Sequence, residues 1–358
     1  MLTVLHVDTE RGWRGGERQV LWLAAGMRDR GHRAIIVARP SDELARRAAA
    51  AKLEVIEAAP RGELDLFAAR NLRRAIVRNG AQVVHAHTAH AAAIAALATL
   101  GTSAKIVIAR RVDFPLRRNL GTRLKYGRAD AVIAVSKAVA AVAAEAGIAR
   151  ERIRVVPDGI DLSRSVQPAS GDKLRSLGIL DGDLLVVQVA ALVAHKDPVT
   201  FVRAMATVRA RLPRVRGLLV GEGPLRAVVQ AEVTRLDLDR TLSLTGFRHD
   251  ADELLAAANV VTLSSVEEGM GSVLLDAMAF GVPIAATRAG GIPEIVLHAD
   301  TGLLSPPGDP QALADNIVRL LSDPELAASL AARARMRVEE FSVDKMVERT
   351  IEVYRGVR

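Results

Sequence analysis

The chain has 358 residues, about twice the length of a common domain, so we expect two domains of roughly 150 to 200 residues each. Half of the residues are apolar and a quarter are charged, which excludes a disordered or low-complexity protein. The chain contains no cysteine, which excludes thiol nucleophiles, disulfides and cysteine metal sites. The net charge of +8 is uneven, because residues 1–163 carry 27 Lys and Arg against 16 Asp and Glu, whereas the remainder carries 22 against 25. The basic half favours an anionic partner, although solubility alone also explains it.

Short β-branched runs alternate with amphipathic helical patterns along the whole chain, which is typical of parallel sheets covered by helices. The first half has predicted strands at 3–7, 33–38, 53–56, 82–85, 105–109, 131–135 and 153–156. Its first helix is predicted to begin near Gly16 and to stop at Gly31. The alternation ends in the polar stretch 163–172 and resumes with strands at 184–189, 217–220, 242–244, 260–263 and 283–286. We therefore predict two doubly wound α/β domains, with a ligand site between them at the carboxyl ends of the strands.

The sequence predicts a cytoplasmic protein. It has no apolar run long enough to span a bilayer, and its first residues include Asp8 and Glu10 where a signal peptide would be basic and then apolar. A basic amphipathic segment, Arg110–Arg128, predicts contact with an anionic acceptor or peripheral association with the inner face of a membrane. A solvated helix face remains the alternative for this segment. Nucleic acid is not expected as a partner, since the chain has only ten aromatic residues to stack on bases.

Two motifs follow strands of the first half. Gly15 and Gly16 come after the first strand and open a helix, where bare backbone amides suit a phosphate, although a simple turn explains them too. His85 and His87 end another strand and lie on one side of it. No carboxylate or cysteine follows closely to complete a metal site, so we interpret one histidine as a hydrogen-bonding group and predict no metal. A polar strand end without a binding role is the alternative.

The second half places charged residues at helix entries. Lys196 follows a strand and leads into a helix, where an ammonium can neutralise a phosphate. A strand, an acid-glycine loop and a helix follow one another from Ser264 to Pro283. In that loop the glycines allow close approach of a ligand, and carboxylates at this spacing can bind sugar hydroxyls. Helix capping by the acids is the alternative, and it does not explain the glycines or the second acid.

In this segment the sequence resembles the retaining glycosyltransferase family 4, which has the GT-B fold. The family's E-x7-E signature matches Glu268 and Asp276, with Asp in place of the usual second Glu. Other matching segments occur in the expected order along nearly the whole chain: Gly15-Gly16-Glu17, His85-Ala86-His87, Val156–Asp161, Gly221–Pro224, Gly246-Phe247-Arg248 and Ala289–Glu294. Their order and spacing are specific for the family, but not for a donor or an acceptor.

The resemblance implies an acceptor-binding domain at 1–163, a linker at 164–172, a nucleotide-sugar-binding domain at 173–341 and a helix at 342–358 that returns to the first domain. The residues it implies as catalytic are Lys196, Glu268 and His87. Those implied for the donor are Gly15, Gly16, Gly221, Phe247, Arg248, Glu268, Gly269, Met270, Gly271, Ser272 and Asp276. For the acceptor we predict Arg111, Asp113, Arg117 and Arg118.

Within this set, the resemblance assigns Glu268 to the hydroxyls of the transferred sugar and Asp276 to the ribose. The backbone at Phe247 and Arg248 is assigned to the base, and Gly16 with Lys196 to the diphosphate. His87 is implied to touch the sugar or the reacting centre. The resemblance implies a nucleoside-diphosphate sugar as the donor substrate and no further cofactor.

The sequence departs from the family at one cation. The diphosphate lysine usually follows an arginine by five residues, and Ala191 stands there instead. Three explanations stay open. Lys196 and the helix N-termini are enough to bind the diphosphate, or Arg226 or Arg288 replaces the missing arginine, or the protein has lost its activity.

The expected reaction is retaining transfer of a sugar to the hydroxyl of a lipid-linked or envelope glycan, without a metal. Two D-x-D triplets, 181–183 and 237–239, fall in turns before strands, whereas a metal triplet belongs at a strand's end. The alternatives are a nucleotide-sugar epimerase of similar fold and a nonenzymatic polyanion-binding protein. A dinucleotide dehydrogenase fits poorly, because the Gly221-Glu222-Gly223 loop lacks the third glycine.

Overall fold

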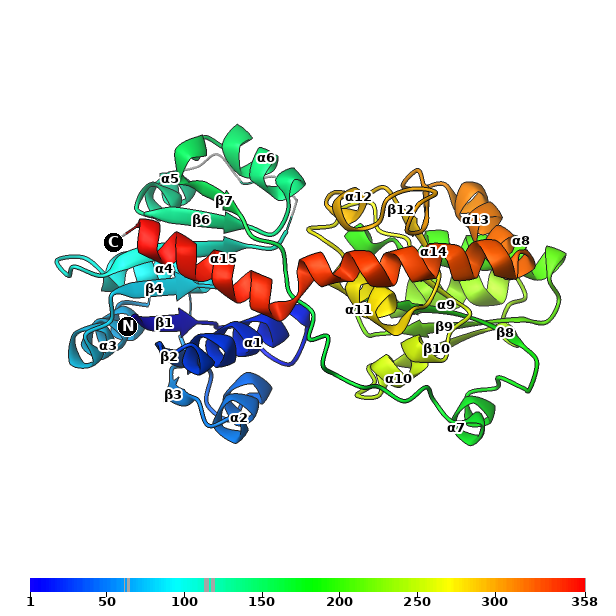
Figure 1. The fold of residues 1–358 in the computed structure, drawn as a ribbon, viewed down its shortest axis with the longest axis horizontal. Helices are drawn as coiled ribbons and strands as arrows, with labels where there is room; N and C mark the ends of the chain where they lie inside the picture. The colour runs from blue at the N-terminus through cyan, green and yellow to red at the C-terminus, as the bar shows by residue number, and fades with distance from the viewer. Residues whose placement is uncertain (61, 63–64, 113–115, 117–119, 358) are drawn as a thin grey trace. The chain divides into compact units, whose positions relative to one another are not determined.

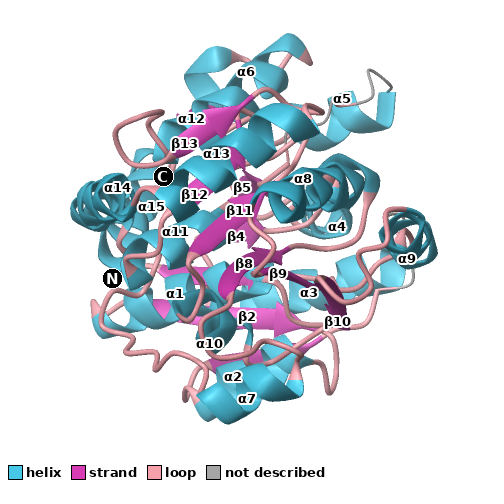
Figure 2. Cartoon of the chain, turned by 90° about the vertical axis from the view of Figure 1, so that its right-hand side faces the viewer, coloured by secondary structure: helices cyan, strands magenta, loops and turns pink. Residues whose placement is uncertain are grey.

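The structure is a computed structural model that describes the chain except for residues 61, 63–64, 113–115, 117–119 and 358. The chain forms two compact units. The N-terminal unit comprises Met1–Gly159 together with Ser342–Arg358, and the C-terminal unit comprises Ile160–Phe341. Each unit is built on a parallel sheet with helices on both faces, which confirms the predicted α/β class (Figures 1 and 2).

The N-terminal unit has a seven-stranded sheet with the order β3-β2-β1-β4-β5-β6-β7. Its strands are β1 (Thr3–Val7), β2 (Arg33–Ala38), β3 (Glu54–Glu57), β4 (Val83–Ala86), β5 (Lys105–Arg110), β6 (Ala131–Ala134) and β7 (Ile153–Val155). Its helices are α1 (Gly15–Asp29), α2 (Glu43–Ala50), α3 (Leu66–Asn79), α4 (Ala89–Ala98), α5 (Leu120–Gly127), α6 (Lys137–Glu145), the 3-10 turn η1 (Arg150–Arg152) and α15 (Val343–Gly356).

Alternating side chains of this sheet pack into two hydrophobic cores, one on each face. Leu5 and Val7 of β1 face a core shared with α3 and α4, whereas Val4 faces a second core shared with α1, α2 and α15. Because successive side chains of a strand point to opposite faces, His6 lies on the same face as Val4. Each large apolar side chain buried in these cores stabilises the fold by about 1.5 to 3 kcal/mol.

The last helix, α15, belongs to the N-terminal unit and packs against α1. A Cβ atom at Gly26 of α1 would lie 2.6 Å from Cγ2 of Val347, so only glycine permits this approach. Where the first stretch of this unit ends, the Gln19 amide donates to the Gly159 carbonyl and accepts from its N–H, both at 2.8 Å. A Cβ at Gly159 would lie 2.8 Å from Cα of Val343, so the chain returns beside the point at which it left.

The C-terminal unit has a six-stranded sheet with the order β10-β9-β8-β11-β12-β13. Its strands are β8 (Leu184–Val189), β9 (Val215–Val220), β10 (Leu242–Gly246), β11 (Val260–Leu263), β12 (Ile284–Thr287) and β13 (Leu303–Ser305). Its helices are α7 (Gly171–Ser176), α8 (Pro198–Arg211), α9 (Arg226–Arg235), α10 (Ala251–Ala256), α11 (Ser272–Phe280), α12 (Ile292–Ile295), α13 (Pro310–Ser322) and α14 (Pro324–Arg337), with 3-10 turns η2 (Ala194–Lys196) and η3 (Val338–Phe341).

The twelve predicted strands all occur, with ends that differ by no more than two residues. The sequence analysis missed β13, a three-residue strand that is defined by its pairing with β12. In the part of the chain that the structure describes, no helix combines the length and the apolar character needed to span a bilayer.

Candidate active site

In the C-terminal unit, the loops after β8 and β9 are held together by backbone contacts. The N–H of Leu192 donates to the Glu222 carbonyl at 2.9 Å, and the N–H of Leu225 donates to the Leu192 carbonyl at 3.0 Å. A Cβ at Gly221 would lie 2.0 Å from the Ala190 carbonyl oxygen, and Gly221 has a φ of +147°. The glycine predicted to contact the donor thus has a local reason to be glycine, because the two loops approach each other there.

Lys196 ends the turn η2 at the carboxyl end of β8. The next residue, Asp197, caps α8 by accepting from the N–H of Thr200 at 3.2 Å. The Ser264 hydroxyl donates to the carbonyls of Lys196 and Asp197 at 3.1 and 2.8 Å. These contacts fix the backbone of the lysine against the end of β11.

The ammonium of Lys196 forms an ion pair with the carboxylate of Glu268. Glu268 is almost completely buried, and Ser265 donates a second hydrogen bond to the same carboxylate oxygen at 3.0 Å. Its backbone carbonyl accepts from the N–H of Gly291 at 2.9 Å. The structure therefore brings together two residues that the sequence placed 72 positions apart, a lysine and the first acid of the signature.

Helix α11 begins directly after this pair. Gly271 is its N-cap and has a φ of +79°, a left-handed conformation that favours glycine. The N-terminus of this nine-residue helix carries a partial positive charge, which favours an anion. Gly269, Met270 and Ser272, predicted for the donor, lie in the turn and first position of this helix.

The second acid, Asp276, is 2% exposed on α11 and forms an ion pair with Arg164 at 3.3 Å. Arg164 also contacts Asp252 at 3.1 Å. Sequence reasoning placed Arg164 in a linker and assigned it no role, because nothing in the polar stretch 163–172 points to a distant acid. The structure shows that this stretch is tied to the C-terminal unit, since Ala169 also donates to the Glu253 carbonyl at 2.9 Å.

The turn after β10 carries the residues predicted for the base. Phe247 is 53% exposed, and its ring meets His249 edge to face with centroids 4.9 Å apart. The guanidinium of Arg248 binds both oxygens of Asp250 at 2.8 Å, and Lys173 contacts the same acid at 2.9 Å. Hydrogen bonding to Arg248 holds the pKa of Asp250 well below its usual range. The Arg248 side chain is thus engaged, which leaves its backbone for the predicted contact.

Two arginines were considered as substitutes for the cation missing at Ala191. Arg226 contacts Glu222 at 3.2 Å and the Leu244 carbonyl at 3.4 Å. Arg288 is exposed at the end of β12. The structure adds Arg164, which already lies against the second acid of the signature.

The carboxylates of both D-x-D triplets contact cations or hydrogen-bond donors. Asp181 contacts Arg175 at 3.0 Å, and Asp183 contacts Arg216 at 3.4 Å. Asp237 contacts Arg209 at 3.4 Å, and Asp239 accepts from the Thr234 hydroxyl at 3.0 Å. These contacts give the triplets a structural role in surface turns.

In the N-terminal unit, α1 begins at Gly15. Its first turn is capped by Glu17, whose carboxylate accepts from the N–H of Arg14 at 2.7 Å. A Cβ at Gly16 would meet no atom within 4 Å, so the space beside this glycine is open. The predicted helix start is confirmed, and the phosphate contact stays a prediction.

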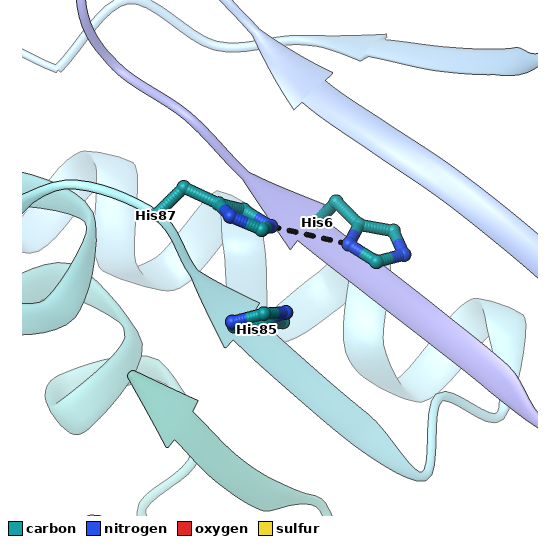
Figure 3. A group of neighbouring side chains, drawn as sticks. All are labelled: His6, His85 and His87. Carbon is teal, nitrogen blue, oxygen red and sulfur yellow. Dashed lines mark hydrogen bonds between the residues drawn. The ribbon is translucent and has the colours of Figure 1, made fainter. Parts of the chain in front are cut away.

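A cluster of three buried histidines lies at the ends of β1 and β4 (Figure 3). His6 and His85 are paired across the two strands, and His87 follows β4. Nδ1 of His6 lies 3.2 Å from Nε2 of His87, and Nδ1 of His85 lies 2.5 Å from the hydroxyl of Tyr354 on α15. The sequence analysis found no third metal ligand because His6 is 79 residues before His85, and only strand pairing joins them.

Arg111 orients this cluster. One of its guanidinium nitrogens lies 3.3 Å from Nδ1 of His87, and another donates to Asp158 at 3.1 Å. Because a guanidinium only donates, Nδ1 of His87 accepts and its Nε2 carries the proton, which it donates to His6. His87 has then used both ring nitrogens, so a metal bound here would have to displace Arg111 or a proton.

Burial controls the ionisation of these groups. Burial and the nearby Arg111 lower the pKa of His6 to about 3, and they hold the pKa of His85 and His87 well below the usual value. Burial raises the pKa of Asp8, directly after β1, from 3.8 to about 7. The imidazoles are thus neutral at pH 7, whereas Asp8 titrates there, a property that no motif indicated.

Tyr354→Phe removes the hydroxyl that bonds His85. A buried polar atom without its partner costs about 1 to 3 kcal/mol, so we expect the free energy of unfolding to fall by that amount in urea denaturation. Tyr126→Phe, at a half-buried tyrosine of the same unit, is the control. Equal stabilities of the two variants would contradict this role of the Tyr354 hydroxyl.

The structure describes one of the four residues predicted to bind the acceptor, Arg111. Asp113, Arg117 and Arg118 lie outside the described residues. Arg111 is described, and its side chain is mostly buried against His87 and Asp158. It thus positions a histidine, and contact with an acceptor stays a prediction.

Comparison with known proteins agrees with this architecture. The family models Glycosyltransferase Family 4 and Glycosyl transferases group 1 match residues 13–164 and 171–337. The N-acetyl-alpha-D-glucosaminyl L-malate synthase of Bacillus anthracis is 30% identical over 82% of this chain and 79% of that protein. A D-inositol 3-phosphate glycosyltransferase of Salinispora arenicola is 32% identical over 57% of this chain and 49% of that protein. HepE of Anabaena, solved with UDP and glucose, is similar at a TM-score of 0.87 and 23% identity, covering 99% of this chain and 100% of that one.

The two wound units and their structural neighbours define a GT-B protein, as expected from the resemblance. The chain belongs to glycosyltransferase family 4 and is a glycosyltransferase.

Proposed function

We propose that the protein transfers a sugar, with retention, from a nucleoside-diphosphate sugar to a hydroxyl of a lipid-linked or envelope glycan. The observation that carries this proposal is the pairing of Lys196 and Glu268 immediately before the N-terminus of α11. One ammonium, one buried carboxylate and one helix start suit a sugar attached to a diphosphate. The solved complex of HepE with UDP and glucose supports a nucleotide sugar as the donor.

Each donor group has a proposed partner. Lys196 and the amides at the start of α11 bind the diphosphate, and the open turn at Gly16 suits a phosphate. Glu268 accepts hydrogen bonds from sugar hydroxyls, and Asp276 accepts them from the ribose. Arg164 is ion-paired with Asp276 and Asp252, and release from these acids would let it supply part of the positive charge that Ala191 lacks.

The transfer step needs no protein nucleophile. The bond between the anomeric carbon and the departing phosphate oxygen breaks, and a bond from that carbon to the acceptor oxygen forms on the same face. The departing phosphate oxygen takes the proton of the acceptor hydroxyl. Lys196 and the helix start stabilise the negative charge on the leaving group, and this stabilisation is the main catalytic device.

The N-terminal unit supplies the acceptor side. His87, held as the Nε2–H tautomer by Arg111, lies at the carboxyl end of β4, where it would touch the sugar or the reacting centre by exchanging Arg111 or His6 for a substrate group. The surplus of basic residues in 1–163 suits an anionic acceptor at the inner face of a membrane. The reaction proceeds without a metal, in keeping with the occupied carboxylates of the D-x-D triplets.

Thermal shift against a panel of nucleotide sugars, followed by NMR of donor and acceptor mixtures, tests the function. A bound donor at 100 times its dissociation constant should stabilise the protein by about 2.7 kcal/mol. Transfer should yield a product with the anomeric configuration of the donor. Conversion of the free donor without any acceptor would instead identify an epimerase, and indifference to every nucleotide sugar would contradict the proposal.

A further inference from the structure

The outer face of α3 combines exposed apolar side chains with arginines. Leu66 and Phe67 at its start are 71% and 77% exposed, and Val77 near its end is 66% exposed. The inner face of the same helix is buried, since Leu72 and Ile76 pack in the core with α4. The apolar side chains on the outside therefore contribute little to the core, although Phe67 lines a hollow beside Ile56, and they form a patch that needs another explanation.

The outer face of α3 carries only positive charge. Between Leu66 and Asn79 the helix contains four arginines and no acid, and all four arginines are exposed: Arg70, Arg73, Arg74 and Arg78. None of the four takes part in an ion pair with another described residue. Elsewhere on this unit arginines commonly have acidic partners, such as Arg33 with Glu54. Among the described residues, the arginines of α3 thus carry positive charge that no ion pair neutralises.

The patch extends beyond the helix. The guanidinium of Arg73 donates to the carbonyl of Leu100, which follows α4 and is 43% exposed. Leu66 and Val77 of α3 and the neighbouring Leu100 therefore add apolar surface beside the arginines. We call these eight residues the α3 patch: Leu66, Phe67, Arg70, Arg73, Arg74, Val77, Arg78 and Leu100. Figure 1 shows α3 at the outside of the N-terminal unit.

We propose that the α3 patch docks the protein on an anionic lipid bilayer. Apolar side chains beside basic ones on a helix face match the boundary between acyl chains and anionic headgroups. Nucleic acid is a poorer partner, because Phe67 is the only aromatic side chain in the patch and no stacking series exists. A second copy of the chain is also disfavoured, because like charges would face each other across the interface.

This docking goes beyond the proposed transfer, since binding to a bilayer requires neither donor nor catalysis. It also deepens the proposal of a lipid-linked acceptor. Asp65 caps α3 at the carboxyl edge of the sheet, and His87 lies at the same edge of the same unit. Leu66 and Phe67 are therefore on the side of the unit at which an acceptor would be bound.

Cosedimentation with vesicles tests the docking. The intact protein should sediment with vesicles of phosphatidylglycerol and phosphatidylcholine, should bind phosphatidylcholine alone weakly, and should be released by salt. L66D/F67D should weaken binding at least tenfold, and acids in a first helical turn do not disturb the helix. L180D/V228D, which changes two exposed apolar residues of the C-terminal unit, is the matched control.

The charges are tested separately. Each arginine at an anionic surface strengthens binding about fivefold, so R70Q/R74Q should weaken it about 25-fold. R240Q/R335Q, at two exposed arginines of the C-terminal unit, should leave it unchanged. Failure of the wild-type protein to sediment, or wild-type binding by both patch variants, would overturn the docking.

Nucleotide binding separates this proposal from the proposed function. L66D/F67D should keep the thermal shift produced by the donor while losing vesicle binding. If no nucleotide sugar binds but the patch variants still lose vesicle binding, the docking holds and the transfer proposal fails. Loss of both properties together with a lower melting temperature would show that the patch is structural, which would overturn the docking.

Discussion

Lys196→Met should lower kcat/KM for sugar transfer by a factor of about 10² to 10³. The ammonium is the proposed counter-charge of the departing diphosphate, and removal of one group that stabilises a developing anion typically costs this much. Weaker donor binding should contribute to the loss, because charge-assisted hydrogen bonds are about twice as strong as neutral ones. Initial rates at several donor concentrations, for wild type and variant, measure both effects.

The buried ion pair requires a second variant. In Lys196→Met the carboxylate of Glu268 keeps its hydrogen bond from Ser265 but loses its ion pair. Removal of one partner of a buried ion pair costs about 3 to 5 kcal/mol of stability. Lys196→Met combined with Glu268→Gln should recover much of that stability and remain inactive. Arg203→Met is the control, because its partner Glu232 keeps a contact with Arg235. Wild-type activity in Lys196→Met would refute the assignment.

Asp8→Asn should make the stability of the protein less dependent on pH. In the folded state burial raises the pKa of Asp8 from 3.8 to about 7, so the native protein binds this proton more tightly than the unfolded chain does. The contribution of Asp8 is therefore most favourable below pH 4 and is lost as the pH rises through 7. At pH 8 the loss reaches about 4 kcal/mol, and the variant should be more stable than wild type by up to that amount.

The measurement is the free energy of unfolding of both proteins between pH 4 and 9. The difference between them should grow up to about pH 7 and then stay constant. His6, with its pKa lowered to about 3, acts in the opposite direction and is common to both proteins, so it cancels. A difference that is independent of pH would contradict a buried, protonated Asp8.

The wound architecture could be predicted because its signals are local. Buried parallel strands are continuous apolar runs, and glycines such as Gly16 and Gly271 mark helix starts. The same locality explains why Lys196 and Glu268 were found, since each follows a strand and the carboxyl ends of parallel strands share one edge. Their direct ion pair was not predicted, because side-chain contacts depend on the path of each loop.

Other parts of the site depend on distant pairing. His6 joins His85 through strand register, Tyr354 reaches His85 from the last helix, and Arg164 reaches Asp276 across 112 residues. His6, Tyr354 and Arg164 belong to no motif, and no periodicity points from them to His85 or Asp276. The raised pKa of Asp8 likewise follows from burial, which a single sequence does not reveal.

The return of α15 to the N-terminal unit restricts how this protein can be recombined with its relatives. A hybrid made with a single junction near residue 160 would combine this N-terminal sheet with a foreign final helix. That helix would need a residue that fits over Gly26 and a hydroxyl that reaches His85. Hybrids that exchange donor specificity should therefore use two junctions, near 160 and 341, so that the first and last segments come from the same parent.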